Sequence, residues 1–246
     1  MTEGLETVME TIHFPVDDLI LKGTLHRPVT PGPPVIIGSH GLLSDSSSPK
    51  QTELAARCAA RGIAFFRFDH RGCGESAGSF SSQTSLINRC RDLASAIRLI
   101  RNRTDLGKRV GLFGSSMGGT VALTVAASHT VDAIVTVAAP VRSDPIIDAI
   151  QAGKTDEPVL KRLPADQLVF DISEQLNGIR NILIFHGDAD ELVPSSDAWI
   201  LHEKTSPFKR LVIQKCGDHR MSDPVHQQEF LRETVEWFSR FLMPGE

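Results

Sequence analysis

The sequence has few cysteines, and they lie far apart. The four residues are Cys58, Cys73, Cys90 and Cys216. Structural metal sites bring their cysteines in closely spaced pairs, so this spacing excludes a cysteine-based metal site. In a chain of this size we expect the four thiols to be reduced and mostly buried.

The chain also lacks a strong excess of charge and any long apolar run. Its 26 lysines and arginines nearly balance 30 aspartates and glutamates, for a formal net charge of −4. This balance gives no reason to expect nucleic acid or an anionic membrane as a partner. The apolar runs are far shorter than a membrane span, and residues 1–10 lack the basic and apolar regions of a secretory signal. We therefore expect a cytoplasmic protein.

What the sequence does contain is an alternation of strand-like and helix-like segments. Short apolar runs, typical of strands buried on both faces, are separated by helical segments. The strands are expected at residues 8–14, 19–26, 35–39, 63–68, 109–113, 133–138, 182–185 and 210–214, and the helices at 50–61, 83–103, 120–127, 195–204 and 224–241. The 246 residues therefore predict an α/β fold: a mostly parallel eight-stranded sheet with helices on both faces and a hairpin at one edge.

One long interval, residues 141–180, contains no strand. It carries helix-like patterns around Ile146 and Ile147 and around Val159 and Leu160. Its position after the sixth strand predicts a small helical cap over the carboxyl edge of the sheet, inserted between two parts of one core, residues 1–140 and 181–246. A plain surface excursion is the alternative.

The strongest functional signal is the pattern G-x-S-x-G at Gly114, Ser116 and Gly118. A strand-like run leads into it, and a helical run rich in alanine, valine and leucine follows. Such a strand-to-helix turn pushes the residue at its corner into a strained conformation, with its side chain above the sheet. Both glycines are needed because a side chain at either position would collide with a neighbouring element. We predict that Ser116 is a nucleophile; a Ser/Gly turn without function is the plainer alternative.

A serine nucleophile needs a base, and the base needs a group that orients it. These groups gather just past the carboxyl ends of the strands, in the chain order serine, acid, histidine. Asp190 lies at the far end of the turn after the strand at 182–185, so we predict that it is the acid. Asp188 is the rival acid, and its plainer explanation is a turn residue whose side chain caps local backbone amides. Glu191 is expected to be solvated.

His219 follows the last strand, in the position that this order requires, and we predict that it is the base. The other candidates have plainer explanations. His186 lies too close to the acid along the chain, and His226 opens the final helix. His26 and His202 look like surface or edge positions.

The negative oxygen that forms during acyl transfer needs two backbone N–H donors. One is expected to be the amide of Met117, directly after the nucleophile at a helix N-terminus. The other is expected to be the amide of Leu42, in the loop after the strand at 35–39, with the Leu42 side chain lining the pocket. The glycine-rich residues 69–76 lack the spacing of a phosphate-binding loop, so we expect a tight turn there.

Together these motifs resemble the serine α/β-hydrolase superfamily. They are the turn around Ser116, His40-Gly41, the turn D-x-R-G-x-G-x-S at 69–76, HGDAD-x-x-VP at 186–194 and G-x-H at 217–219. Within the superfamily the chain is similar to small-cap carboxylesterases of the cinnamoyl/feruloyl esterase type. That similarity rests on Gly78-Ser79-Phe80, the length of the interval 141–180, and Gly217-Asp218-His219. The resemblance implies an α/β-hydrolase fold and activity on esters.

The predicted reaction is a two-step acyl transfer in which His219 takes the proton of Ser116 and Asp190 holds the imidazole. We expect a small-molecule ester as substrate, no metal or organic cofactor, and neither nucleic acid nor membrane as a partner. The oligomeric state stays open, with a homodimer as one option. A thioesterase, peptidase or amidase with the same triad is the first alternative, and a non-catalytic ligand receptor with a hydrolase fold is the second.

Overall fold

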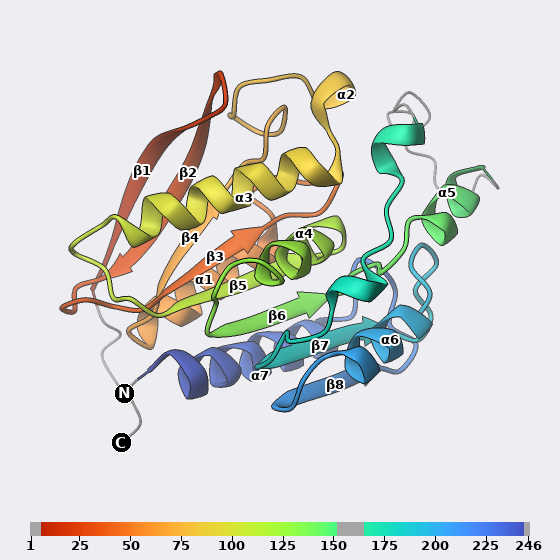
Figure 1. The fold of residues 1–246 in the computed structure, drawn as a ribbon. Helices are drawn as coiled ribbons and strands as arrows, with labels where there is room; N and C mark the ends of the chain where they lie inside the picture. Colours follow the sequence, from red (N-terminus) through yellow and green to blue (C-terminus); the bar gives the residue numbers. More distant parts are fainter. Residues whose placement is uncertain (1–5, 152–164, 244–246) are drawn as a thin grey trace.

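The computed structural model describes residues 6–151 and 165–243. These residues form an eight-stranded sheet in the order β1-β2-β4-β3-β5-β6-β7-β8, which runs through the middle of the molecule (Figure 1). β1 and β2 form an antiparallel hairpin at one edge, β2 is also antiparallel to β4, and the other neighbouring strands are parallel. The predicted fold class is confirmed.

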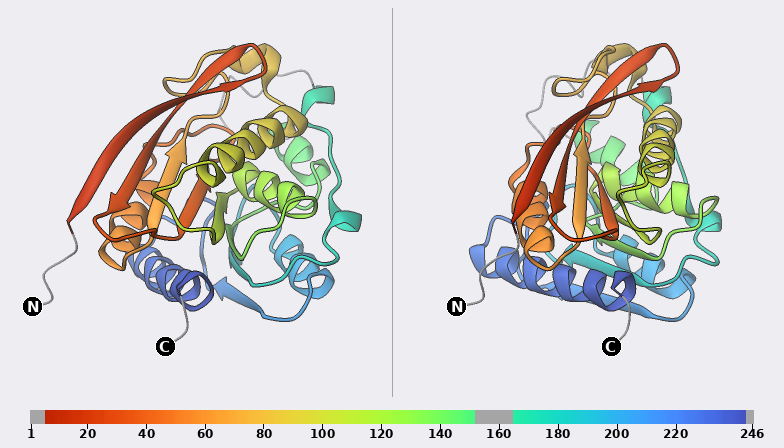
Figure 2. Two further views of the ribbon diagram at one scale, coloured as in Figure 1. Left: turned by 60° about the vertical axis from the view of Figure 1, so that its left-hand side comes forward. Right: turned by 90° about the vertical axis from the view of Figure 1, so that its left-hand side faces the viewer.

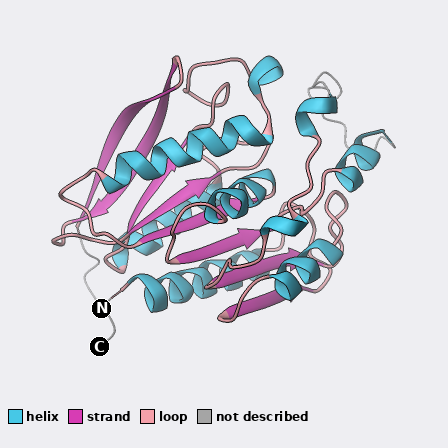
Figure 3. Cartoon of the chain, viewed as in Figure 1, coloured by secondary structure: helices cyan, strands magenta, loops and turns pink. Residues whose placement is uncertain are grey.

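The strands are β1 (Thr7–Val16), β2 (Leu19–Pro28), β3 (Val35–Ser39), β4 (Ala64–Phe68), β5 (Val110–Ser115), β6 (Ala133–Val137), β7 (Ile182–Gly187) and β8 (Lys209–Gln214). The α-helices are α1 (Pro49–Ala60), α2 (Phe80–Gln83), α3 (Leu86–Arg101), α4 (Met117–Ala126), α5 (Asp144–Gln151), α6 (Ser196–Lys204) and α7 (Pro224–Leu242). Two short 3₁₀ helices, η2 (Ala165–Leu168) and η3 (Ser173–Gln175), precede β7. Figure 3 shows the strands as a central layer between helices.

The helices bury the sheet from both sides. α3 and α4 pack their apolar stripes against one face, together with the β1–β2 hairpin, and α6 covers the β7 end of that face. α1 and α7 cover the opposite face, where Phe113 and Phe185 meet Phe230. Figure 2 shows this arrangement from two further sides. Strands covered on both faces explain the short continuous apolar runs of the sequence.

One predicted helix begins later than expected. The segment 83–103 was expected to be helical from its start, but Gln83 ends the short helix α2, the chain is extended at Thr84 and Ser85, and α3 begins at Leu86. The Ser85 hydroxyl accepts a hydrogen bond from the Asn88 amide and caps a new helix. A serine side chain that satisfies a free amide of the first turn competes with continuing the preceding helix, and this explains the break.

The interval between β6 and β7 is partly described. α5 covers the first predicted pattern, around Ile146 and Ile147, whereas Val159 and Leu160 lie outside the described residues. An isolated bridge between Arg142 and Asp171 joins the two ends of the interval. The division into a core and a cap stays a prediction.

All four cysteines are free. Cys58 and Cys73 are buried, Cys90 is half-buried and Cys216 is exposed. Among the described residues, no helix has the length and the apolar content that crossing a bilayer requires.

Candidate active site

Ser116 lies at the sharp turn between β5 and α4. Its backbone angles are φ 53° and ψ −126°, a strained conformation for a residue with a side chain. The turn is tight enough that a Cβ atom at Gly114 would collide with the Gly118 carbonyl, and one at Gly118 with the Ser39 carbonyl. The Ser116 amide donates to the Val137 carbonyl at 2.7 Å, which ties the turn to the neighbouring strand β6. These contacts hold the hydroxyl above the sheet.

The structure brings Ser116, His219 and Asp190 together. The His219 Nε2 atom lies 3.1 Å from the Ser116 Oγ atom. The Nδ1 atom of the same ring lies 2.8 Å from Asp190 Oδ2. Because a carboxylate can only accept, Nδ1 carries the proton, and Nε2 is left free to accept the proton of the serine hydroxyl. The three residues predicted from strand ends and chain order therefore form one hydrogen-bonded series.

Asp190 is held by four donors. Its side chain is fully buried, and Oδ1 accepts the amides of Leu192 at 2.9 Å and Val193 at 2.8 Å. His186 Nε2 lies 3.3 Å from Oδ2. Burial by itself would raise the pKa of Asp190, but the hydrogen bonds from His186, His219 and Val193 outweigh it and hold the pKa well below its usual range. The carboxylate therefore stays charged.

The neighbouring candidates have other roles. Asp188 accepts the amide of Cys216, the capping role that its position in the turn suggested. Glu191 is exposed as expected, but its carboxylate also accepts the backbone amide of His219 at 3.2 Å. His186 was not predicted to take part, yet its ring bridges Asp190 and the Val193 carbonyl, 3.0 Å away. Its position at a strand end, four residues before the acid, was the available signal.

The two predicted oxyanion donors come from two different segments next to Ser116. Met117 is the first residue of α4, and Leu42 lies in the loop after β3; both line the cavity beside Ser116. A Cβ atom at Gly41 would lie 3.6 Å from Ser116 Cβ, so this loop packs directly on the nucleophile. In the described part of the chain, neither the Leu42 amide nor the Met117 amide donates to a protein acceptor. Both are free to bind an oxygen atom of a ligand.

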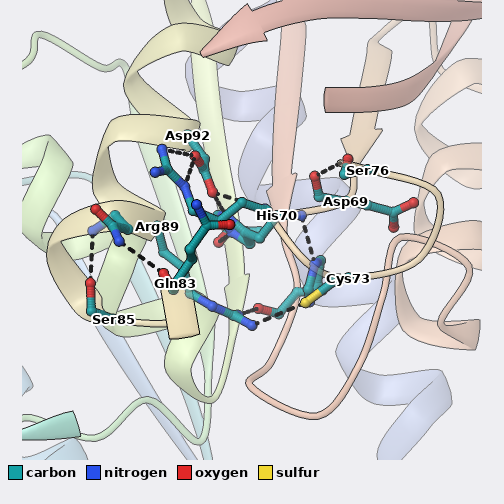
Figure 4. Close-up of polar contacts among 12 residues, drawn as sticks. Asp69, His70, Cys73, Ser76, Gln83, Ser85, Arg89 and Asp92 are labelled. Carbon is teal, nitrogen blue, oxygen red and sulfur yellow. Dashed lines mark hydrogen bonds and ion pairs between the residues drawn. The ribbon is translucent and has the colours of Figure 1, made fainter. Parts of the chain in front are cut away.

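A buried polar network lies behind this loop. Ser39 Oγ is 2.9 Å from His70 Nε2, and His70 Nδ1 is 3.3 Å from Asp92 Oδ2 (Figure 4). This is a second series of serine, histidine and aspartate, but all three residues are fully buried and no substrate reaches them. Asp92 also binds Arg71, with Nε 2.8 Å from Oδ1.

The turn at 69–76 supports the same region. Asp69 accepts the amides of Ser46 at 2.7 Å and Glu75 at 3.0 Å, and a Cβ atom at Gly74 would collide with the Asp69 carboxylate. These contacts agree with the predicted tight turn and explain its glycine.

We expect the protein to lose stability as the pH falls below that at which an unfolded histidine titrates, about 6.5. Burial lowers the pKa of His70 to about 4, and burial with the charge of Arg67 does the same for His26, also to about 4. Between these pH values the unfolded chain binds more protons than the folded chain. The free energy of unfolding should then fall by up to about 1.4 kcal/mol per pH unit for each ring. Denaturant unfolding across this range measures the slope.

The matched variants are His70→Asn, which removes one buried ring, and His13→Asn, which removes an exposed one. The slope should become shallower in the first and stay unchanged in the second. An unchanged slope in His70→Asn would contradict the lowered pKa of His70 as a cause of the pH dependence.

A cavity of about 610 Å³ adjoins Ser116 and His219. Its apolar lining comes from both sides of the site: Leu42, Leu43, Met117, Ile146, Ile147, Leu168, Phe170, Leu192, Val193, Phe230 and Leu231. Lys50, Gln51 and Glu53 of α1 add a polar side. The cavity is large enough for a small organic molecule whose reacting carbon lies at the serine.

The parallel sheet, the sharp turn at its centre and the hydrogen-bonded residues at its carboxyl edge place the protein in the α/β-hydrolase class. Within that class, the chain belongs to the family described as serine aminopeptidase, S33, whose family model matches residues 33–165, just over half of the chain.

Among curated proteins, the chain is 29% identical over 218 residues to the uncharacterized protein YfhR of Escherichia coli K12, covering 85% of this chain and 71% of that protein. It is 29% identical over 191 residues to YfhR of E. coli O157:H7, where the match spans 75% of this chain and 62% of the relative's length. It is 26% identical over 195 residues to the uncharacterized protein YqkD of Bacillus subtilis, covering 70% and 60%.

Solved structures of other proteins share the fold, and two of them show the degree of similarity. The Pyrococcus furiosus esterase Pf2001 superposes with a TM-score of 0.81 at 18% identity, covering 97% of this chain and 92% of that chain. Est1E from Butyrivibrio proteoclasticus, bound to ferulic acid, superposes with a TM-score of 0.78 at 17% identity, covering 95% and 100%.

Proposed function

We propose that this protein is a serine hydrolase that cleaves carboxylic esters of small molecules through an acyl-enzyme intermediate. The observation that carries the proposal is the hydrogen-bonded series Ser116, His219 and Asp190, with spacings of 3.1 and 2.8 Å, next to a cavity lined mainly by apolar side chains. The structural neighbour Pf2001 is described as an esterase, which supports esters as the substrate class.

In the first half of the proposed reaction, His219 Nε2 takes the proton of Ser116 as Oγ bonds to the acyl carbon. The carbonyl oxygen becomes negative and accepts hydrogen bonds from the amides of Leu42 and Met117. The charged carboxylate of Asp190 stabilises the protonated imidazole. The ester bond then breaks, and His219 gives its proton to the departing alcohol.

In the second half, a water molecule replaces the alcohol. His219 takes a proton from the water, whose oxygen attacks the acyl carbon of the acyl-enzyme. The bond to Ser116 Oγ breaks, and the imidazole returns the proton to the serine. The carboxylic acid leaves, and no residue is consumed in the cycle.

The family description makes amide cleavage the second candidate. An aminopeptidase has to bind the ammonium group of its substrate, which a carboxylate close to the nucleophile does best. Among the described residues that line the cavity, the only carboxylate is that of Glu53, an exposed residue on α1. The lining near Ser116 is apolar, which favours an uncharged acyl group.

We also propose that the interval 141–180 acts as a cap on this site. Ile146 and Ile147 of α5 and Leu168 of η2 line the cavity together with Phe170. Phe170 is the only aromatic residue of the interval. An aliphatic acyl group therefore matches this lining better than a large aromatic one.

The substrate class is tested with p-nitrophenyl esters, acyl-CoA thioesters and aminoacyl p-nitroanilides at equal concentrations. We expect the highest kcat/KM for short aliphatic esters, because the described residues that line the cavity beside Ser116 are mainly apolar and include no carboxylate there. Faster cleavage of the anilides would contradict the ester proposal in favour of a peptidase. Faster cleavage of the thioesters would contradict the ester proposal in favour of a thioesterase.

A further inference from the structure

Arg89, near the start of α3, is the largest side chain that the fold buries completely. A fully buried arginine is rare because its charge loses its water. The guanidinium lies behind the loop that carries Leu42, beside Cys73 and the buried network of His70 and Asp92 (Figure 4).

The guanidinium binds three consecutive backbone carbonyls of this loop. Nη1 lies 3.3 Å from the His40 oxygen and 3.2 Å from the Gly41 oxygen. Nη2 lies 3.0 Å from the Leu42 oxygen and 3.5 Å from Cys73 Sγ. The planar, multiple donors of arginine suit such a set, whereas a lysine ammonium is a single point.

The charge has no carboxylate partner. Within the described ranges, no ion pair involves Arg89, and its Nε atom has no hydrogen-bond partner. The nearby carboxylate of Asp92 is already bound by Arg71 and His70. An apolar side chain of similar volume would fill this space without burying a charge, so packing alone does not explain an arginine here.

The carbonyl of Gly41 is held twice. Besides Arg89, it accepts a hydrogen bond from His40 Nδ1 at 2.8 Å, and the Nε2 atom of the same ring accepts the His70 amide at 3.0 Å. In a trans peptide the C=O and the following N–H point in opposite directions, and no described peptide bond is cis. Fixing the Gly41 oxygen therefore fixes the Leu42 N–H on the other side of the loop.

We propose that Arg89 is a positioning residue for the oxyanion hole: by holding the carbonyls of His40, Gly41 and Leu42, it aims the Leu42 amide at the substrate oxygen. A cation on the carbonyl also polarises the peptide and makes its N–H a stronger donor. The inference rests on the proposed acyl-transfer function, since it assigns a role within that reaction.

The test compares Arg89→Met and Arg89→Lys with the wild type in kcat, KM and affinity for an alkylboronic acid. The boronic acid bonds to the serine as a tetrahedral adduct whose oxygen occupies the oxyanion hole. We expect Arg89→Met to lower kcat by about 10²-fold, as loss of an oxyanion donor does, with KM changed by less than about threefold. The boronic acid affinity should fall by a similar factor as kcat. The kcat and the boronic acid affinity of Arg89→Lys should lie between those of the wild type and those of Arg89→Met.

Leu25→Ala serves as the stability control, because Leu25 of β2 is fully buried in the core on the α3 and α4 side of the sheet and lines no part of the cavity. It should lower Tm while kcat and boronic acid affinity stay at wild-type values. The proposal is overturned if Arg89→Met keeps wild-type kcat and boronic acid affinity, or if Leu25→Ala lowers both in proportion to Tm. If Arg89→Met does not fold, wild-type values in Arg89→Lys overturn the proposal.

Labelling of the wild type by a fluorophosphonate separates the two hypotheses. A wild-type protein that is not labelled at Ser116 would contradict both the acyl-transfer function and the role of Arg89. Labelled wild-type protein together with an unaffected Arg89→Met variant contradicts only the role of Arg89.

Discussion

Replacing Ser116 with alanine is expected to lower ester hydrolysis by on the order of 10⁶-fold in kcat, because no other group supplies the nucleophile. His219 Nε2 would lose its hydrogen-bond partner 3.1 Å away, and no acyl-enzyme could form. The rate of p-nitrophenyl ester hydrolysis measures the loss. A fluorophosphonate should label the wild type at Ser116, as located by peptide mapping. The same label should be absent from Ser116→Ala.

Ser128→Ala is the matched control for this variant. Ser128 is an exposed serine just past the end of α4, the helix that begins after Ser116. Its removal should leave both the rate and the labelling unchanged. Hydrolysis by Ser116→Ala at close to the wild-type rate would show that the nucleophile is misassigned and would favour a different site or a ligand-binding role.

Asp190→Asn is expected to lower kcat by about 10⁴-fold while the fold persists. The asparagine side chain is neutral and presents an N–H₂ donor, so it no longer stabilises the protonated imidazole or holds the proton on Nδ1 of His219. His186, 3.3 Å from Asp190 Oδ2, would also lose the charged partner of its ring. The measurement is kcat for the best ester of the substrate panel.

Asp188→Asn is the natural comparison, because it makes the same chemical change two residues away. An asparagine oxygen can still accept the Cys216 amide that Asp188 binds, so kcat should stay within about threefold of the wild type. A larger loss in Asp188→Asn than in Asp190→Asn would reverse the assignment of the acid, the rivalry that the sequence alone left open.

Two features of α3, its first residue and the contacts of Arg89, were not predicted from the sequence. The start of α3 was misplaced because residues 83–85 are all polar and the apolar pattern begins only at Leu86, while the capping of the Asn88 amide by Ser85 depends on a single side chain. Arg89 stands on the apolar stripe of that helix, between the half-buried Leu86 and the buried Leu93. A charged residue on such a stripe was a visible signal, but its partners in the loop after β3 were not.

His186 illustrates the same limit within the site. Along the chain it looked too close to Asp190 to act as the base. The strand end and the following turn nevertheless bring its Nε2 atom to the carboxylate and to the Val193 carbonyl. Such a contact depends on how the turn closes, which residue spacing does not specify.

By itself, the sequence determined the alternation of strands and helices, the turn at Ser116 and the order of the chemical groups. These features follow from short-range physics: the period of apolar residues, and the lack of room for a Cβ atom at Gly114 and Gly118. Only the tertiary structure brought the predicted groups into hydrogen-bond distance and added others that were not predicted. His219 reaches Ser116 across 103 residues, and Arg89 reaches the Gly41 carbonyl across 48, because parallel strands end at one edge and the helices pack on their faces. No local pattern encodes such distances.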